Sequence, residues 1–139
     1  ILARFSGTTS EMNKKHNMLL CFDFGVKKIG ICFGETIAGS STPLPVIKNN
    51  NESMKKIKSY VDEWDPEAFL IGCPSKPSKD FFRQLNIFKE NLRNEFKLEV
   101  IESNEDFTSQ IIPSEFKNKE YDSLSAQKIF ESWVNTKNE

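Results

Sequence analysis

The sequence predicts an α/β fold in which a five-stranded mixed sheet carries helices on both faces, in the order β-β-β-α-β-α-β-α-α. Two observations lead to this prediction. Three segments rich in β-forming residues follow one another near the start of the chain, and helical and strand-like segments then alternate. Consecutive strands pair antiparallel, whereas strands separated by helices pair in parallel. A length of 139 residues suits one domain, which we expect to span residues 18–139.

The first three strands are predicted between Met18 and Ile47. Two apolar runs flank residues 23–28, and the second of them is rich in β-formers, which indicates a hairpin. The third segment, residues 37–47, contains Pro43 and Pro45. Because proline cannot donate a hydrogen bond to a neighbouring strand, this segment is expected at an edge of the sheet or with a break near its end.

A helix and a buried strand are predicted next. Apolar residues at helical spacing lead up to Trp64, after Asn51 and Ser53 as candidate caps and before Asp65 and a proline. Residues 68–74 form a short apolar run that ends in glycine and proline. Such a run is typical of a central strand covered on both faces.

The last third of the chain completes the alternation. A phenylalanine-rich pattern over residues 81–96 predicts a second helix, whose aromatic side chains we expect in the core and not on a surface that stacks bases. Residues 98–102 predict the fifth strand. A third helix is expected from Asn104 to Ile112, and a loop then leads to a last helix over residues 124–134.

Composition restricts the class of protein. Hydrophobic residues make up 37% and charged residues 28% of the chain, as in folded soluble proteins, and no run approaches the roughly 20 apolar residues of a membrane span. With a net charge of -1, any nucleic-acid binding must depend on a local patch. The three cysteines lack metal-ligand spacing and are expected to be reduced thiols in a cytoplasmic protein: Cys21, Cys32 and Cys73. Residues 1–17 are expected to form a flexible extension, with Met12 or Met18 as the natural start; this segment holds His16, the only histidine, which argues against histidine chemistry.

An aspartate interrupts the most apolar run of the chain. Asp23 stands between Phe22 and Phe24, and because burial of an isolated carboxylate is costly, such a group normally finds a cation, hydrogen-bond donors or a metal ion. The predicted topology brings Glu105, just past the fifth strand, and Asp122, at the start of the last helix, to the same edge of the sheet. Carboxylates suit Mg²⁺ or Mn²⁺. Two such ions can activate a water and stabilise the leaving oxygen of a phosphodiester.

Each of these acids also has a purely structural explanation. Asp23 could be a satisfied polar group in a turn, and Asp122 an N-cap. Glu105 lies in an acidic stretch with Glu102 and Asp106 and could be a solvated acid in the first turn of a helix. The occurrence of three acids at one edge favours a metal site.

The order of elements matches the RNase H-like fold, and several motifs resemble the YqgF family. Bacterial members of that family are described as nucleases for pre-16S ribosomal RNA and as Holliday junction resolvase-like proteins. The resemblance runs from Met18 to about Val134. The motifs that carry it are Phe22-Asp23-Phe24-Gly25 with Lys27, Ile29 and Gly30, Ile71-Gly72-Cys73-Pro74, Asn104-Glu105-Asp106-Phe107-Thr108, and Asp122-Ser123 with Ala126 and Ile129.

The resemblance implies a metal-dependent nuclease with Mg²⁺ or Mn²⁺ as cofactor and Asp23, Glu105 and Asp122 as catalytic and metal-binding carboxylates. It implies structured RNA as substrate, in the maturation of the 5′ end of pre-16S rRNA within a ribosomal precursor particle, or branched DNA. The family usually has arginine directly after the glutamate, where this chain has Asp106. Because an acid repels phosphate, Glu102 is kept as the alternative ligand.

Basic residues near the same edge are the candidates for contacts with nucleic acid. Their alternative role is that of ordinary solubilising residues. Contacts to the phosphate backbone would be salt-sensitive and carry no sequence information. The candidates are Lys27, Lys28, Lys76, Lys79, Arg83, Lys117 and Lys119.

Two further functional classes fit part of the sequence. The chain could be a catalytically weak RNase H-like nucleic-acid-binding module in ribosome assembly, with Asp106 weakening the metal site. Residues 23–25 also resemble the phosphate loop of actin-like and sugar-kinase ATPases, which need two lobes where this chain provides one. A protein kinase is excluded for the same reason and because its glycine-rich and catalytic loops are missing.

Overall fold

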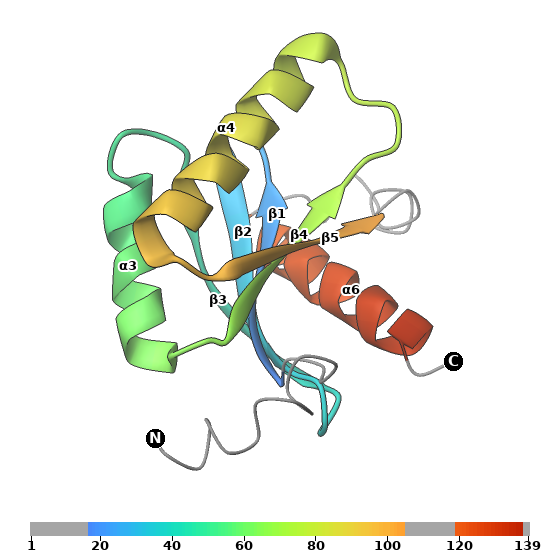
Figure 1. The fold of residues 1–139 in the computed structure, drawn as a ribbon. Coiled ribbons are helices and arrows are strands. Elements are labelled where there is room, and N and C mark those ends of the chain that lie inside the picture. The colour runs from blue at the N-terminus through green and yellow to red at the C-terminus, as the bar shows by residue number, and fades with distance from the viewer. Residues whose placement is uncertain (1–16, 105–118, 138–139) are drawn as a thin grey trace.

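The computed structural model describes residues 17–104 and 119–137, which form one five-stranded sheet with helices on both faces (Figure 1). The strands lie in the order β3-β2-β1-β4-β5; β2 pairs antiparallel with both β1 and β3, and β4 pairs in parallel with both β1 and β5. The predicted fold class is confirmed. The elements are β1 (Met18–Phe24), β2 (Lys28–Glu35), β3 (Ser40–Lys48), α3 (Ser53–Trp64), β4 (Ala68–Cys73), α4 (Lys79–Phe96), β5 (Glu99–Asn104) and α6 (Lys119–Lys137).

Some element boundaries differ from the prediction. β5 continues to Asn104, because its polar last residues still pair through their backbones with β4. The last helix already begins at Lys119, and β3 begins at Ser40 after a turn in which Gly39 has φ 69°. Residues 1–16 of the extension expected over residues 1–17, and nearly all of the helix predicted after Asn104, lie outside the described residues.

The predicted caps of α3 take a different role. The residue at the N-cap position is Glu52, which makes no side-chain capping bond. Ser53 is buried instead, where its hydroxyl donates to the Lys48 carbonyl (2.8 Å) and accepts from the Asn50 N–H (2.8 Å). Ser53 therefore closes the loop between β3 and α3.

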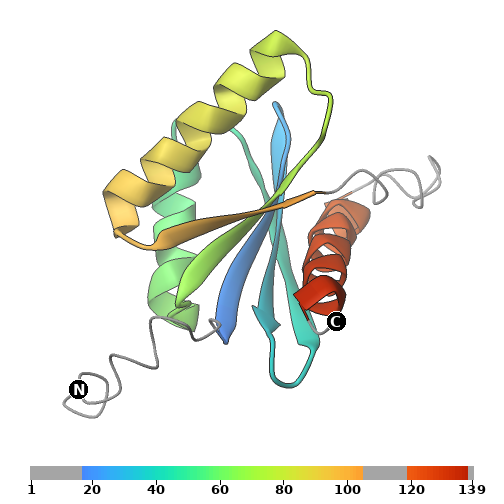
Figure 2. The ribbon, with the colours of Figure 1, turned by 45° about the vertical axis from the view of Figure 1, so that its right-hand side comes forward.

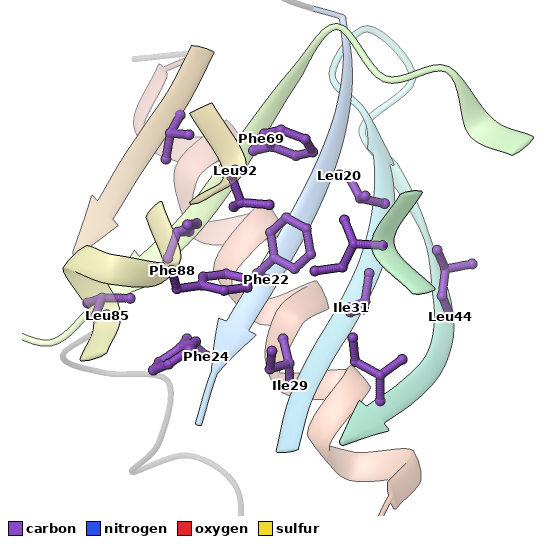
Figure 3. Packing of buried hydrophobic residues seen from close by; sticks show 14 of the residues in the cluster. Leu20, Phe22, Phe24, Ile29, Ile31, Leu44, Phe69, Leu85, Phe88 and Leu92 are labelled. Atoms are coloured by element: carbon purple, nitrogen blue, oxygen red, sulfur yellow. The ribbon is translucent and has the colours of Figure 1, made fainter. Parts of the chain in front are cut away.

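Alternation along the strands sorts the side chains onto two faces of the sheet, and helices lie on both sides of it (Figure 2). Helices α3 and α4 cover one face. On this face the ring of Phe22 packs against those of Phe69 and Phe88, with centroid distances of 5.6 and 5.5 Å (Figure 3). Helix α6 covers the other face, over a smaller cluster that includes Cys21 and Phe130. Neighbouring residues of one strand thus contribute to two separate cores.

The cysteines are free, as expected. Cys21 and Cys32 are fully buried opposite each other on β1 and β2, and Cys73 is partly buried at the end of β4. Burial, followed by the hydrogen bond and charge interaction with Cys32, raises the pKa of the Cys21 thiol well above its ordinary value. Within residues 17–104 and 119–137, no helix is long and apolar enough to cross a membrane.

Candidate active site at the carboxyl edge of the sheet

Asp23 is the penultimate residue of β1, at the edge where the three parallel strands have their carboxyl ends. Leu19 and Cys21, at alternate positions before it, belong to the cluster beneath α6, whereas Phe22 and Phe24 belong to the opposite cluster. The side chain of Asp23 therefore faces α6. It is half-buried, so its carboxylate is less deeply enclosed than the apolar run around it indicates.

Glycines flank Asp23 on both neighbouring strands. Gly30 of β2 pairs directly with Asp23. On the other side, Phe22 pairs with Ile71, so the next residue along β4 is Gly72, which in turn pairs with Ser103 of β5. Paired residues of a sheet point to the same face, and the positions beside the carboxylate thus carry no side chain. Both glycines are buried. The carboxylate of Asp23 is the type of ligand that hard cations such as Mg²⁺ prefer.

The start of α6 lies at the same edge as Asp23. The hydroxyl of Ser123 donates to the Leu44 carbonyl (2.6 Å), and the amide of Gln127 donates to the Ser41 hydroxyl (2.9 Å). Leu44 is aligned through Ile31 with Phe22, whereas Ser41 lies toward the amino end of β1. Helix α6 therefore runs antiparallel to β1 and begins beside its carboxyl end.

This direction brings the backbone of Asp122 to the edge that carries Asp23. Asp122 is the fourth residue of α6, which begins at Lys119, and so it does not occupy the N-cap position. The positive end of the helix dipole at this terminus favours bound anions and carboxylates. The side chain of Asp122 lies outside the described part of the chain.

The two candidates for the third ligand are separated by the structure. Glu105 follows the last residue of β5 in sequence and lies outside the described residues. Glu102 points to the α4 face, opposite to Asp23, where its carboxylate accepts a hydrogen bond from the buried ammonium of Lys89 at 2.7 Å. The structure therefore does not bring Glu102, the alternative ligand, together with Asp23. In the described ranges, no three acidic, cysteine or histidine side chains form a metal-binding group.

The turn between β1 and β2 is held in place by Asn49. The side-chain amide of Asn49 donates to the Gly25 carbonyl (2.7 Å), and its backbone N–H donates to the Lys27 carbonyl (2.9 Å). A Cβ on Gly25 would approach the Lys28 carbonyl oxygen to 2.6 Å, so this turn requires glycine. Asn49 thereby holds in place the turn that carries two exposed lysines, Lys27 and Lys28, shortly after Asp23 in the sequence. The sequence carried no local signal for this role, because Asn49 is distant from the turn along the chain.

Further basic residues lie next to this turn. The ring centroids of Phe24 and Phe81 are 5.7 Å apart, so the first turn of α4 packs against the end of β1. The exposed cations of these two segments, which we call the basic rim, are Lys27, Lys28, Lys76, Lys79 and Arg83. Arg83 forms an ion pair with Asp80, and its hydrogen bond is the main cause of the lowered pKa of that exposed carboxyl. Of the other predicted cations, Lys117 and the side chain of Lys119 lie outside the described residues.

Two solved structures share the arrangement of strands and helices. Thermus thermophilus RuvC in complex with a Holliday junction substrate superimposes with a TM-score of 0.62 at 12% identity, over 88% of this chain and 96% of that chain. The fowlpox virus resolvase bound to Holliday junction DNA gives 0.54 at 9% identity, over 88% and 99%. The fold is thus RNase H-like, as the order of elements predicted.

Sequence comparison identifies the family within that class. The model of the RuvX family, described as a Holliday junction resolvase family, matches residues 17–136, and the chain belongs to this family of nucleases. The predicted resemblance to YqgF, another name for RuvX, is confirmed.

Several bacterial relatives are similar over most of their length. A protein of Buchnera aphidicola subsp. Baizongia pistaciae is 30% identical over 84% of this chain and 95% of its own length. A protein of Blochmanniella floridana is 30% identical over 89% and 98%. One of Pseudomonas paraeruginosa is 26% identical over 88% and 94%. Each of the three is named "Putative pre-16S rRNA nuclease".

Proposed function

We propose that this chain is a divalent-metal-dependent nuclease that hydrolyses phosphodiester bonds in pre-16S rRNA and acts in the maturation of its 5′ end. The observation that carries the proposal is the position of Asp23. This carboxylate faces α6 at the carboxyl edge of the sheet, between Gly30 and Gly72, and the first turn of α6 begins at the same edge. The names of the bacterial relatives support the choice of substrate.

Asp23, Glu105 and Asp122 are the proposed ligands of Mg²⁺ or Mn²⁺. Carboxylate oxygens are the donors these ions prefer, and the residues beside Asp23 on both neighbouring strands are glycines, which add no competing side chain. When bound, the ions would supply activation of a water and stabilisation of the leaving oxygen. The chain itself orients the scissile phosphate, because the basic rim and the amino end of α6 attract the phosphates on either side.

The test of the metal site is Asp23→Asn, which keeps the shape of the side chain and removes its charge. We expect cleavage of a pre-16S rRNA fragment with Mn²⁺ or Mg²⁺ to fall to background while the melting temperature stays close to that of the wild type. The matched control is Asp62→Asn on α3, an exposed aspartate paired with Lys58 far from the edge, which should leave cleavage unchanged. Full cleavage by Asp23→Asn would refute the assignment.

Branched DNA is the second candidate substrate. The RuvX family model is described as a Holliday junction resolvase, and both solved structures contain junction DNA. Wild-type protein should therefore be assayed in parallel on a pre-16S rRNA fragment and on a four-way DNA junction. Cleavage of the junction alone would replace RNA by DNA in the proposal, with the same carboxylates in the same roles.

A non-catalytic binding module is the third possibility, since Asp106 replaces the family's usual arginine. Calorimetric titration with Mn²⁺ separates this function from the nuclease. Binding that disappears in Asp23→Asn supports the nuclease, and absence of binding at millimolar metal favours the module.

The proposed action on a ribosomal precursor particle requires that the protein is located in the cytoplasm. Fractionation of cells would test this location.

A further inference from the structure

One large aromatic side chain in the first turn of α4 remains exposed. Phe81 and Phe88 pack against the sheet, as the predicted core pattern requires, but Phe82 is 52% exposed. The sequence prediction that all phenylalanines of this helix serve the core is therefore wrong at Phe82. A lone exposed apolar residue needs no explanation by itself, so its surroundings decide what it does.

Phe82 lies at the carboxyl edge of the sheet. Phe81 contacts Phe24 at the carboxyl end of β1, and Phe96 contacts Phe69 near the amino end of β4, so α4 runs antiparallel to these strands. Phe82 precedes Lys89 by two helical turns and shares its side of the helix. Measured along the helix axis, Phe82 thus lies about 10 Å nearer than Lys89 to the carboxyl edge of the sheet.

The ion pair of Lys89 shows which part of β5 lies beside this part of α4. Lys89 contacts Glu102, two residues before β5 ends at Asn104. Two strand residues span about 7 Å, less than the displacement of Phe82 along the helix. Phe82 therefore lies toward the carboxyl edge of the sheet, the edge to which Asp23 belongs, on the helix that covers the face opposite to the one that Asp23 faces.

Positive charge surrounds this ring. Lys79 lies one helical turn before Phe82, Arg83 follows it, and Lys76 lies in the loop that leads into α4. Residues 23–28 and 75–83 together contain five cations and two carboxylates, whereas the other residues of the chain hold 14 basic and 18 acidic side chains. The positive excess of this weakly acidic protein is thus concentrated around Phe82 and the neighbouring turn.

We propose that Phe82 stacks on an unpaired nucleobase of the substrate, with the basic rim holding the phosphates of the same strand. An exposed aromatic ring among cations is the combination that binds single-stranded nucleic acid, because every base offers a π-face and every nucleotide a phosphate. A base inside a duplex has its faces covered by its neighbours. Phe82 thereby selects substrates with an unpaired nucleotide near the scissile bond. This inference rests on the proposed function and names the strand conformation that the site prefers.

Binding measurements in the Asp23→Asn background test the proposal without cleavage. The probe is a fluorescent single-stranded RNA of about 12 nucleotides, compared with a duplex of the same sequence. Phe82→Ala should weaken binding of the single strand by about 5- to 100-fold, with a much smaller effect on the duplex. Phe82→Trp should retain binding, and Phe82→Leu, which keeps apolar bulk without the aromatic face, should not. The control is Ile87→Ala, since Ile87 is 50% exposed on the same helix but farther from the edge.

The possible results separate this inference from the proposed function. Unchanged single-strand binding by Phe82→Ala overturns it, and a lowered melting temperature with that result would assign the ring to packing within the protein. Equal losses on single strand and duplex also overturn it, because a contact to the backbone would then explain them. Lack of binding to either RNA in every variant, including the Phe82-containing parent, would count against RNA as the substrate and so against the proposed function as well.

Discussion

The two faces of the sheet are built from the same strands and serve different purposes. On the α4 face, Phe22 and Phe24 join an aromatic cluster that includes Phe69 and Phe88. On the α6 face, the residue between those two phenylalanines is Asp23, and the buried residues before it on that face are Cys21 and Leu19, neither of them aromatic. One strand thus directs an aromatic core to one side and a carboxylate to the other.

This difference indicates how the molecule accommodates an acid within an apolar strand. The aromatic face contributes most of the burial that stabilises the fold, because large rings remove the most apolar surface from water. On the α6 face, the carboxyl edge carries Asp23 with glycines beside it. Stability and chemistry are therefore expected to depend on adjacent residues that can be changed separately.

The largest effect should come from truncation on the aromatic face. Phe22 is fully buried and contacts the rings of Phe69 and Phe88, so Phe22→Ala should lower the free energy of unfolding by about 3–5 kcal/mol. Asp23→Asn, one residue away, should change it by less than about 1 kcal/mol while it abolishes cleavage. Urea denaturation and an RNA cleavage assay measure both quantities. A similar loss of stability in both variants would break the division between the faces.

The next largest effect concerns the close packing of α6. A Cβ on Gly34 would lie 2.4 Å from the ring of Phe130, which is fully buried. Gly34→Ala should therefore destabilise the protein by about 1–3 kcal/mol through overpacking. Phe130→Leu should relieve part of this cost, so that the double variant loses less stability than the sum of the single ones. Additive losses in denaturation experiments would show that the helix simply shifts outward.

A smaller effect is expected at the ion pair between Lys89 of α4 and Glu102 of β5. The Lys89–Glu102 and Arg93–Glu90 pairs both have N···O distances of 2.7 Å, but the Lys89 side chain is 8% exposed and that of Arg93 is 40% exposed. Glu102→Gln should cost about 1 kcal/mol, because it leaves a buried ammonium with a neutral partner. Glu90→Gln should cost no more than about 0.5 kcal/mol. Equal effects in denaturant titrations would mean that burial does not distinguish the pairs.

The smallest effect is a dependence of stability on alkaline pH. The pKa of Cys21 is raised above 9.0 in the folded protein, first by burial and then by Cys32. As the pH rises through 9, the unfolded chain loses this proton while the folded chain keeps it, so the free energy of unfolding falls. The loss should remain below about 1 kcal/mol up to pH 9.5.

A comparison of pH dependences isolates this contribution. Denaturation of wild type and Cys21→Ala under reducing conditions at pH 8 and 9.5 gives the change in stability of each protein. The Ala variant starts from a lower value because of its cavity, so only the two changes with pH are compared. A steeper fall in the wild type is expected, and equal falls would contradict the assignment to Cys21.

Much of the fold could be predicted because its signals are local. The periods of apolar residues predicted the three described helices and the five strands, and the prolines of β3 correctly indicated an edge strand. The boundary of β5 was wrong because its end is held by backbone pairing with β4, which needs no apolar side chains. Phe82 was misassigned because a helical stripe of four phenylalanines does not reveal which ring lies just outside it.

The sequence by itself determined the family, the fold class and the identity of Asp23 as the unusual residue, since these depend on residue types and spacings along the chain. Only the tertiary structure decided that Asp23 faces α6, that Gly30 and Gly72 lie beside it, and that Glu102 turns away to Lys89. The physical reason is that a strand presents alternate residues to opposite faces. Which face receives a given residue, and what lies beside it, depends on pairing with residues far away in the chain.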